Sequence, residues 1–355
     1  MFMKALIAMS GGVDSSVAAL LMQKKGFSCI GVTMKLYNND DIGMCSDKTC
    51  CSLNDVTDAK SVCCNLGFPH YTFGFTNQFK EKVIDKFIYC YENGATPNPC
   101  IDCNRYLKFE ALYRRAKELD CDKIVTGHYA RIEKYKDRYL LKKAFDETKD
   151  QSYVLYSMTR EQLSNTCFPC GELKKEQIRQ IAYNAGFTNA KKHDSQDICF
   201  VPNGKYADFI SNYTHKEYPC GDIIDKNGNV LGRHNGIIHY TIGQRKGIGL
   251  SFSEPMYVCE INSQENTITL GKNEDLYTRE LNINECVWPA YDNIPDIINA
   301  KVKIRYSHKE QSAKIIPTSD TTAHIVFDEP QRAVTKGQAA VIYLDDFVVG
   351  GGIIT

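Results

Sequence analysis

Three cysteines offer the clearest reactive chemistry in this chain of 355 residues. Cys100 and Cys103 form a C-x-x-C in "TPNPCIDCNRYLKF", and Cys199 stands in "KKHDSQDICF". Pro97 and Pro99 stiffen the approach to the first pair, and the pattern places Cys103 at the start of a helix. Because a helix N-terminus lowers the pKa of a thiol, this position favours a nucleophilic Cys103.

The C-x-x-C alone has three interpretations: half of a zinc site, a redox pair, or one nucleophile with an incidental neighbour. A zinc site needs further ligands elsewhere in the chain. Cys199 by itself is typical of a buried core cysteine. The residues therefore leave all three interpretations open.

A glycine pair marks a second candidate site, in "IAMSGGVDSSVAAL". Gly11 and Gly12 allow a sharp turn from strand to helix and a close approach of a ligand to the backbone. Amides at the helix N-terminus favour phosphate oxygens, and Asp14 offers a carboxylate to Mg²⁺. Hydroxyl donors stand nearby at Ser10, Ser15 and Ser16. No Lys-Ser or Lys-Thr pair follows the glycines, so this is not a Walker loop, and an ordinary turn is the simpler alternative.

Two more segments end where such a site would lie. "VTMKLY" puts Met34 at the end of a strand, where it can flank an adenine or simply fill the core. "TGHYAR" supplies Gly127, which permits close approach, and His128, whose side chain suits either a site or a structural hydrogen bond.

The elements that position these residues alternate between strands and helices. "MKALIAM", "CIGVTMKLY", "HYTFGF" and "KIVTGHYA" are expected strands, and helices are expected at Val13 to about Lys25, "NDVTDAKSVCCNLG", about Gln78 to Asn93, and "RYLKFEALYRRAKELD". This alternation predicts an α/β fold with a doubly wound parallel sheet. In such a sheet the ligand binds at the carboxyl ends of the strands, where the glycine loop, Met34, Gly127 and His128 are expected.

From about Gly204 the pattern changes to short alternating strands separated by Asn, Asp and Gly turns, which predicts antiparallel β-structure. We therefore expect three domains: an α/β domain at 1–203 that contains the glycine loop and the three cysteines, a small β-rich central domain at 204–273, and a C-terminal β-barrel at 274–355.

Composition narrows the class of protein. The hydrophobic fraction of 43% and the charged fraction of 24% are those of a globular chain. The formal net charge is +0, so a nucleic acid would have to be bound by local basic segments such as "RIEKYKDRYLLKK" and "AKVKIRYSHKEQSAK". Sixteen cysteines without an export signal or a long apolar run indicate reduced thiols and a cytoplasmic location, with no membrane partner.

Seven motifs in register carry a family resemblance. "SGGVDSS" resembles the loop of the pyrophosphate-loop ATPases, which cleave ATP to AMP and pyrophosphate. Together with "TPNPCIDCNRYLKF", "TGHYAR", "KDQSYVLY", "KKHDSQDICF", "HYTIGQRKGIG" and "RAVTKGQAAVIY", it makes the chain similar, from Ala5 to the final "GGGII", to the tRNA 2-thiouridylases.

The resemblance implies roles for individual residues. Cys103 matches the nucleophile of the family and Cys199 its persulfide carrier. The matched ATP-binding positions are Ala8, Met9, Ser10, Gly11, Gly12, Val13, Asp14, Ser15, Ser16, Met34 and Gly127. The matched tRNA-binding positions are Asn98, Pro99, Cys100, His128, Lys149, Asp150, Gln151, Arg305, Tyr306 and Gln338. Some family members have Asp where this chain has Cys100, so the acid or base role considered for that Asp cannot be transferred.

The implied reaction is the ATP-dependent 2-thiolation of the wobble uridine of tRNA. ATP with Mg²⁺ adenylates the C2 oxygen of uracil and releases pyrophosphate, after which a persulfide on Cys199 supplies the sulfur and AMP leaves. A separate protein, such as a cysteine desulfurase or a sulfur relay protein, loads that persulfide, the anticodon arm of tRNA is the nucleic-acid partner, and no tightly bound metal is expected.

Two alternatives to this function remain at the level of sequence. One is a tRNA thiolase of the same ATPase class in which Cys100, Cys103 and Cys199 bind an iron-sulfur cluster. The other is a non-catalytic, zinc-stabilised RNA-binding protein whose glycine loop is only a turn.

Overall fold

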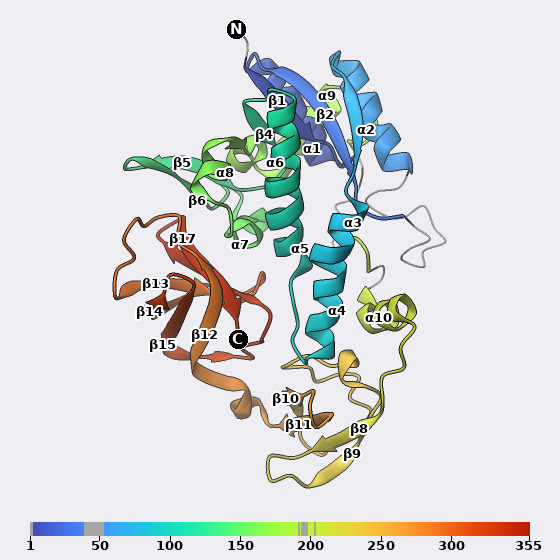
Figure 1. Cartoon of the computed structure of the whole chain (residues 1–355), viewed down its shortest axis with the longest axis vertical. Helices are drawn as coiled ribbons and strands as arrows, with labels where there is room; N and C mark the ends of the chain where they lie inside the picture. The colour runs from blue at the N-terminus through green and yellow to red at the C-terminus, as the bar shows by residue number, and fades with distance from the viewer. Residues whose placement is uncertain (1–2, 39–52, 191, 193–197, 202–203) are drawn as a thin grey trace. The chain divides into compact units, whose positions relative to one another are not determined.

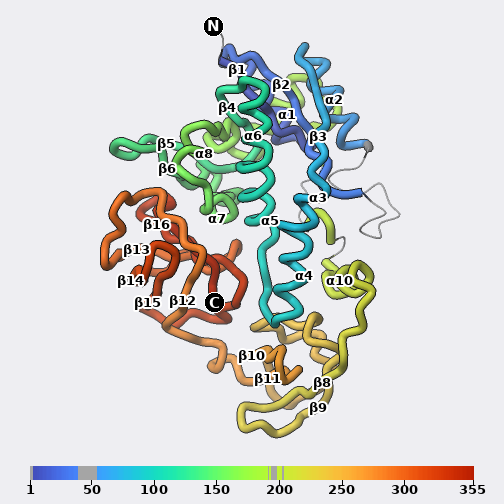
Figure 2. The backbone as a smooth tube through the Cα atoms, in the orientation of Figure 1, coloured from blue at the N-terminus to red at the C-terminus, as the bar shows by residue number. Residues whose placement is uncertain are grey.

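The computed structural model describes residues 3–38, 53–190, 192, 198–201 and 204–355. It divides into two compact units, which are treated separately below (Figures 1 and 2). The first unit comprises Met1–Val83, Cys100–Gly204 and Asp346–Val349, and the second comprises Ile84–Pro99, Lys205–Asp345 and Gly350–Thr355. The domain boundary expected at residue 203 lies outside the described residues.

The first unit is built on a parallel sheet in the order β3-β2-β1-β4-β7. Its strands are β1 (Lys4–Ala8), β2 (Ser28–Lys35), β3 (His70–Gly74), β4 (Lys123–Val125) and β7 (Thr166–Cys167). After Lys4 the sequence of β1 is apolar through Ala8, because both faces of this central strand are covered. The predicted α/β fold with a parallel sheet is confirmed.

Helices cover both faces of this sheet. The helices of this part of the chain are α1 (Val13–Lys24), α2 (Leu53–Leu66), α3 (Thr76–Phe79), α5 (Pro99–Asp102), α6 (Leu112–Glu118), α7 (Ser152–Leu155), α8 (Arg160–Ser164) and α9 (Lys175–Asn184). The strand order reverses direction between β1 and β4, so right-handed crossovers place α1 and α2 on one face and α6 on the other, as Figure 1 shows. Val17 and Ala18 of α1 pack in one core with Ile178 and Ala182 of α9.

Among the described residues, two helices contain π-helical turns. Residues Lys80–Ile84 are π-helical between α3 and α4 (Asp85–Glu92), and residues Cys103–Ala111 are π-helical between α5 and α6. We call the second stretch the π-segment. In it the amide of Leu112 donates to the carbonyl of Leu107, a spacing of five residues instead of the four of an α-helix. The first unit also holds the hairpin of β5 (Arg131–Tyr135) and β6 (Arg138–Lys142), whose strands pair antiparallel.

The second unit contains α4, α10 (Tyr206–Thr214) and two sheets. One sheet has the order β10-β11-β8-β9, with β8 at Gly221–Ile224, β9 at Val230–His234, β10 at Tyr257–Asn262 and β11 at Thr267–Gly271. The expectation of purely antiparallel structure is wrong here, because β11 pairs parallel with β8. Each of the two hairpins is antiparallel, but the long connection between them lets β11 run alongside β8 in the same direction.

The other sheet of the second unit is the C-terminal barrel. It is formed by β12 (Tyr277–Val287), β13 (Ile298–Lys303), β14 (Gln311–Ser319), β15 (Thr322–Arg332), β16 (Ala339–Leu344) and β17 (Phe347–Ile354). Ile283 of β12 faces Ile354 of β17, and this pairing closes the sheet on itself, so the predicted barrel is confirmed. Across the described ranges, no helix combines the length and the apolar character needed to cross a bilayer.

Candidate functional site

The glycine loop connects β1 to α1 at the carboxyl edge of the sheet, beside the point where the strand order reverses. Gly11 has a φ of +73°, and a Cβ there would overlap the backbone of Asp55. Gly12 is the N-cap of α1 and makes no side-chain cap, so the first amides of the helix remain open to a ligand. The expected strand-to-helix turn is present.

The serine hydroxyls of the loop are held inward. Ser15 Oγ and Ser16 Oγ both donate to the carbonyl of Gly12 at 3.0 Å, and Ser15 Oγ accepts from the amide of Ser10 at 3.3 Å. Ser15 and Ser16 are buried, and Ser10 is exposed. The loop is therefore shaped before any ligand arrives.

Gly127 closes the loop from the neighbouring strand β4. A Cβ at this position would lie 2.7 Å from the carbonyl carbon of Asp14 and 2.7 Å from the amide nitrogen of Ser15. These are backbone atoms at the first turn of α1, so only glycine allows this approach. The structure thus brings Gly127 against the predicted ATP-binding loop, as the motif "TGHYAR" requires.

Asp14 does not offer a free carboxylate to a metal. Lys175 Nζ lies 2.8 Å from Asp14 Oδ1 and 2.9 Å from Oδ2, and the Tyr129 hydroxyl donates to Oδ1 at 2.7 Å. Among the described residues no group of three or more His, Cys, Asp or Glu side chains is placed to hold a metal ion. The backbone amides of the glycine loop fit a phosphate ligand. Because Asp14 is paired with Lys175, Mg²⁺ would have to be bound mainly by the phosphates of that ligand.

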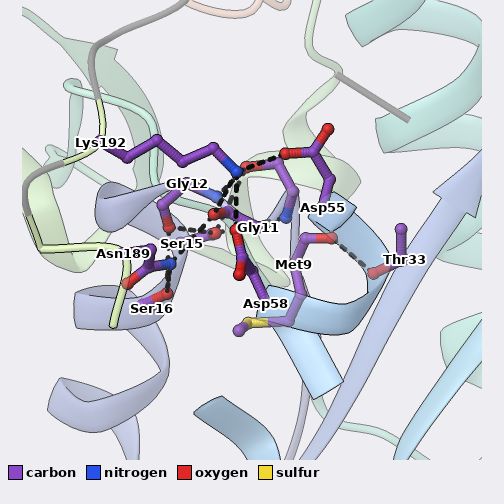
Figure 3. A network of polar contacts seen from close by, with 11 residues as sticks. Met9, Gly11, Gly12, Ser15, Ser16, Thr33, Asp55, Asp58, Asn189 and Lys192 are labelled. Carbon is purple, nitrogen blue, oxygen red and sulfur yellow. Dashed lines mark hydrogen bonds and ion pairs between the residues drawn. The ribbon is translucent and has the colours of Figure 1, made fainter. Parts of the chain in front are cut away.

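A cluster of polar contacts supports the loop from segments far along the chain (Figure 3). Asn189 Nδ2 donates to the Gly11 carbonyl at 3.0 Å and to Ser16 Oγ at 2.9 Å. Lys192 Nζ donates to the same carbonyl at 3.3 Å and forms ion pairs with Asp55 at 2.5 Å and Asp58 at 2.8 Å. Sequence interpretation missed these residues, although "KKHDSQDICF" contains Lys192.

Met34 lies in β2 opposite Phe73 of β3 and is 9% exposed. Its neighbour Thr33 donates to the carbonyl of Met9, which ties the end of β2 to the start of the loop. Met34 is therefore near the loop and largely buried, which suits either of the predicted roles.

The expectation that Cys103 starts a helix is wrong. The helix begins at Pro99 with α5, so Cys103 lies in its second turn, at the beginning of the π-segment. Burial raises the pKa of the Cys103 thiol to about 11, Lys108 lowers it in part, and Cys100 and Asp102 raise it further. The helix N-terminus thus does not activate this thiol.

His128 is buried and neutral. Lys108 Nζ lies 3.3 Å from His128 Nε2 and has only hydrogens to offer, so Nε2 accepts and Nδ1 donates to Thr126 Oγ1 at 2.6 Å. Burial lowers the pKa of His128 well below its usual value, and Lys108 lowers it further. The rings of Phe109 and Phe168 pack around the imidazole.

Cys199 is partly exposed, and its carbonyl accepts a hydrogen bond from the Tyr37 hydroxyl at 2.8 Å. Cys103 and Cys199 are both free thiols. A second C-x-x-C, Cys167 and Cys170, also exists in the chain and was overlooked as a possible partner of the first. Cys170 is fully buried and donates to the Asp14 carbonyl, so it belongs to the core behind the loop.

The predicted tRNA-binding residues of the first unit differ in their surroundings. Asp150 accepts hydrogen bonds from the amides of Ala144 and Ser152 and from the Ser152 hydroxyl. Gln151 Oε1 accepts from the amide of Tyr129, next to His128. Lys149 ends a short 3-10 turn just before them. The structure therefore brings Gln151 and His128 together and gives Asp150 a local structural role.

In the second unit, Gln338 lies beside the segment that leads to the cysteine motif. Gln338 Nε2 donates to the Thr96 carbonyl at 2.8 Å, and the Thr96 amide donates to the Lys336 carbonyl at 2.8 Å. The turn just before β16, which contains Lys336 and Gln338, thus holds the stretch immediately before Asn98 and Pro99. Arg305 donates to the Arg332 carbonyl at 3.3 Å, and Tyr306 is 43% exposed, as a residue that stacks on a base would be.

Comparison with known proteins identifies the family. Residues 3–203 match the family model described as the tRNA methyl transferase HUP domain, residues 207–272 match the tRNA methyl transferase PRC-barrel domain, and residues 278–354 match the Aminomethyltransferase beta-barrel domain. A curated relative from Clostridioides difficile (strain 630), tRNA-specific 2-thiouridylase MnmA, is 49% identical over 100% of this chain and 99% of its own length. The chain belongs to the tRNA-specific 2-thiouridylase family.

A second member of the tRNA-specific 2-thiouridylase family, from Clostridium beijerinckii, is 46% identical over 99% of this chain and 98% of its own length. The chain is thus a tRNA-uridine 2-sulfurtransferase by family, as its motifs predict. Among solved structures, an NMN synthetase from Francisella tularensis covers 61% of this chain and 79% of its own at 17% identity and a TM-score of 0.35. A likeness this weak says nothing about what the chain binds.

Proposed function

We propose that this protein replaces the C2 oxygen of the wobble uridine of tRNA by sulfur at the expense of ATP. The proposal rests above all on the 49% sequence identity, over the whole chain, with a tRNA-specific 2-thiouridylase. The chain also contains the glycine loop and two partly exposed cysteines, Cys103 and Cys199. Oxide is too poor a leaving group for direct replacement, so the oxygen must first become part of a better one.

In the first step the C2 oxygen attacks the α-phosphorus of ATP, the bond to the β-phosphate breaks, and pyrophosphate leaves. The preformed loop from Ser10 to Ser16 supplies backbone amides, and the exposed Ser10 supplies a hydroxyl, for the β- and γ-phosphates. Gly127, which packs against the backbone of Asp14 and Ser15, would border the nucleotide together with Ala8, Met9, Val13 and Met34. Magnesium ion, when bound with ATP, would shield the charge on the departing pyrophosphate.

In the second step a persulfide on Cys199 supplies sulfur. Its terminal sulfur bonds to C2 and AMP leaves with the original oxygen; Cys103 as thiolate then attacks the sulfur of Cys199, which frees the thiocarbonyl and leaves a Cys103–Cys199 disulfide. In the other route, Cys103 first releases hydrosulfide from the persulfide, and hydrosulfide attacks C2. Both routes need an external thiol to reduce the disulfide and a donor protein to reload Cys199.

The proposed RNA contacts come from both units. Asn98, Pro99 and Cys100 would meet the target base, which must leave its stack to reach the thiols. His128, Lys149, Asp150 and Gln151 of the first unit and Arg305, Tyr306 and Gln338 of the second would contact the anticodon arm. We also retain the division into domains at 1–203, 204–273 and 274–355, and a cytoplasmic location, as part of the proposal.

The direct test is a reaction of the protein with ATP, unmodified tRNA and a sulfide source, followed by nucleoside analysis. We expect 2-thiouridine and AMP in equal amounts, and the absence of both would refute the function. With a protein persulfide donor, Cys199→Ser should lose sulfur transfer, whereas Cys220→Ser, an exposed cysteine of the second unit, should keep it. Iron and labile sulfide in anaerobically purified protein would instead favour the iron-sulfur thiolase.

A further inference from the structure

Cys103 lies at the start of a π-helical stretch, and this winding determines which side chains share a face with its thiol. Cys103 and Lys108 are five residues apart, which is about 1.4 turns of an α-helix, so in an α-helix they would lie on different faces. The residues from Cys103 to Ala111 are π-helical, with hydrogen bonds between groups five residues apart. Five residues then make about one turn, and Lys108 comes onto the face of Cys103.

The contacts of Lys108 leave its positive charge available to a nearby anion. Lys108 is half-buried, and in the described part of the chain no carboxylate lies within ion-pair distance of it. Among the described residues its hydrogen-bond partner is the neutral Nε2 of buried His128, at 3.3 Å. His128 is in turn fixed by Thr126 and by the rings of Phe109 and Phe168. A cation directed by a neutral acceptor keeps its full charge available to a nearby anion.

We propose that Lys108 is a positioning residue for Cys103, whose ammonium group stabilises the negative charge on the Cys103 sulfur when the thiol gives up its proton. This inference rests on the proposed function, in which Cys103 reacts as a thiolate. The proton passes to solvent, because Cys103 is partly exposed and His128 Nε2 is occupied by Lys108. The π-segment places the Lys108 ammonium group on the same side of the helix as the Cys103 sulfur.

The other charged or titratable groups near Cys103 act in the opposite direction. Asp102 and Cys100 of α5 both disfavour a negative sulfur, and so does burial. Lys108 is the one neighbour that favours it. Removing the charge of Lys108 should therefore leave the thiolate with no compensating group among the described residues.

The test measures the reactivity of Cys103 itself. The alkylation rate of Cys103 by iodoacetamide is followed from pH 7 to 9.5 by mass spectrometry, with fragment ions that separate Cys103 from Cys100. For Lys108→Met we expect the pKa of Cys103 to rise by about one unit, which lowers the alkylation rate at every pH in this range because the whole range lies below that pKa. At fixed pH the rate should fall roughly threefold, because tenfold less thiolate is partly offset by its greater nucleophilicity.

Three further variants make the outcome specific. Lys108→Arg keeps the charge and should restore the wild-type profile, and Lys108→Gln is a second neutral variant if the methionine variant does not fold. Lys117→Met is the matched control, since Lys117 is exposed on α6 and pairs with Glu161. The inference is wrong if Lys108→Met or Lys108→Gln has the thermal stability of the wild-type protein and its alkylation rate at Cys103 is also unchanged across the pH range.

A loss of tRNA affinity in Lys108→Met without any shift of the Cys103 profile would also overturn the inference and make Lys108 a phosphate contact. Failure of the proposed function has a different signature. In that case the wild-type protein makes no 2-thiouridine, while the alkylation profiles still report on Lys108 and Cys103.

Discussion

The glycine loop and the cysteine helix both lie in the first unit, but their functional groups are positioned in opposite ways. The loop is held by side chains distant in sequence: Lys175 on Asp14, and Asn189 and Lys192 on Gly11. The cysteine helix positions Cys103 and Lys108 through its own winding. The loop is thus held by long-range contacts, whereas the winding of one helix brings Lys108 toward Cys103.

This difference predicts where substitutions do most damage. Changes at the loop should lower the free energy of unfolding together with ATP affinity, because the same contacts serve both. Changes at the cysteine helix should alter protonation and leave most of the stability intact. Four predictions test this contrast, beginning with the largest expected effect.

Gly127→Ala should disrupt the loop most strongly. The new Cβ would lie 2.7 Å from backbone atoms of Asp14 and Ser15, which cannot move without shifting α1. We expect the free energy of unfolding to fall by about 3 kcal/mol and ATP affinity to fall at least tenfold, measured by urea denaturation and calorimetry. Gly74→Ala, where a Cβ meets nothing within 4 Å, is the control. Equal behaviour of the two variants would contradict the close approach.

Lys175→Met should break the ion pair with Asp14. Lys175 is buried, while the side chain of Asp14 is 30% exposed, so water and Tyr129 partly compensate the carboxylate. We expect a loss of about 2 kcal/mol of unfolding free energy, less than for a fully buried pair. The double variant Asp14→Asn with Lys175→Met should recover part of this loss. Additive effects of the two changes would show that the pair does not couple.

Asp55→Asn and Asp58→Asn test the two ion pairs of Lys192. The Asp55 side chain is 9% exposed and that of Asp58 is 31% exposed. Burial lowers the pKa of Lys192, but its hydrogen bonds to Asp55 and Asp58 outweigh this effect and leave the pKa raised. We expect urea denaturation to show a loss of about 1 kcal/mol for Asp55→Asn and under about 0.5 kcal/mol for Asp58→Asn. The reverse order would contradict the assigned burial.

His128→Gln should change the pH dependence of stability more than stability itself. Burial holds the pKa of His128 well below 6.5, so the folded state stays neutral while the unfolded chain binds a proton as the pH falls below 6.5. Stability from this group is present above pH 6.5 and is lost below it, by at most about 1.4 kcal/mol per pH unit. Urea denaturation at pH 7.5, 6.5 and 5.5 should show a shallower loss in the variant. An unchanged pH slope would refute a buried neutral His128.

Much of the fold followed from local patterns. The apolar run of β1, the glycine pair and the alanine-rich start of α1 predict a strand, a turn and a helix whatever the rest of the chain does. The same holds for the hairpin turns of the second unit, although the parallel pairing of β11 with β8 depends on a long connection and was not predictable from local pattern. The motifs also identified the family, because seven of them occur in this chain in the order that the family has.

The sequence by itself determined which residues can do chemistry: the glycines, the serines of the loop, Cys103 and Cys199. Only the tertiary structure decided their environment. It turned Asp14 toward Lys175, brought Lys192 to the Gly11 carbonyl across 181 positions, and put Cys103 inside a π-helical turn instead of at a helix end. Burial and long-range charge set pKa values and hydrogen-bond partners, and neither is encoded in the spacing of residues along the chain.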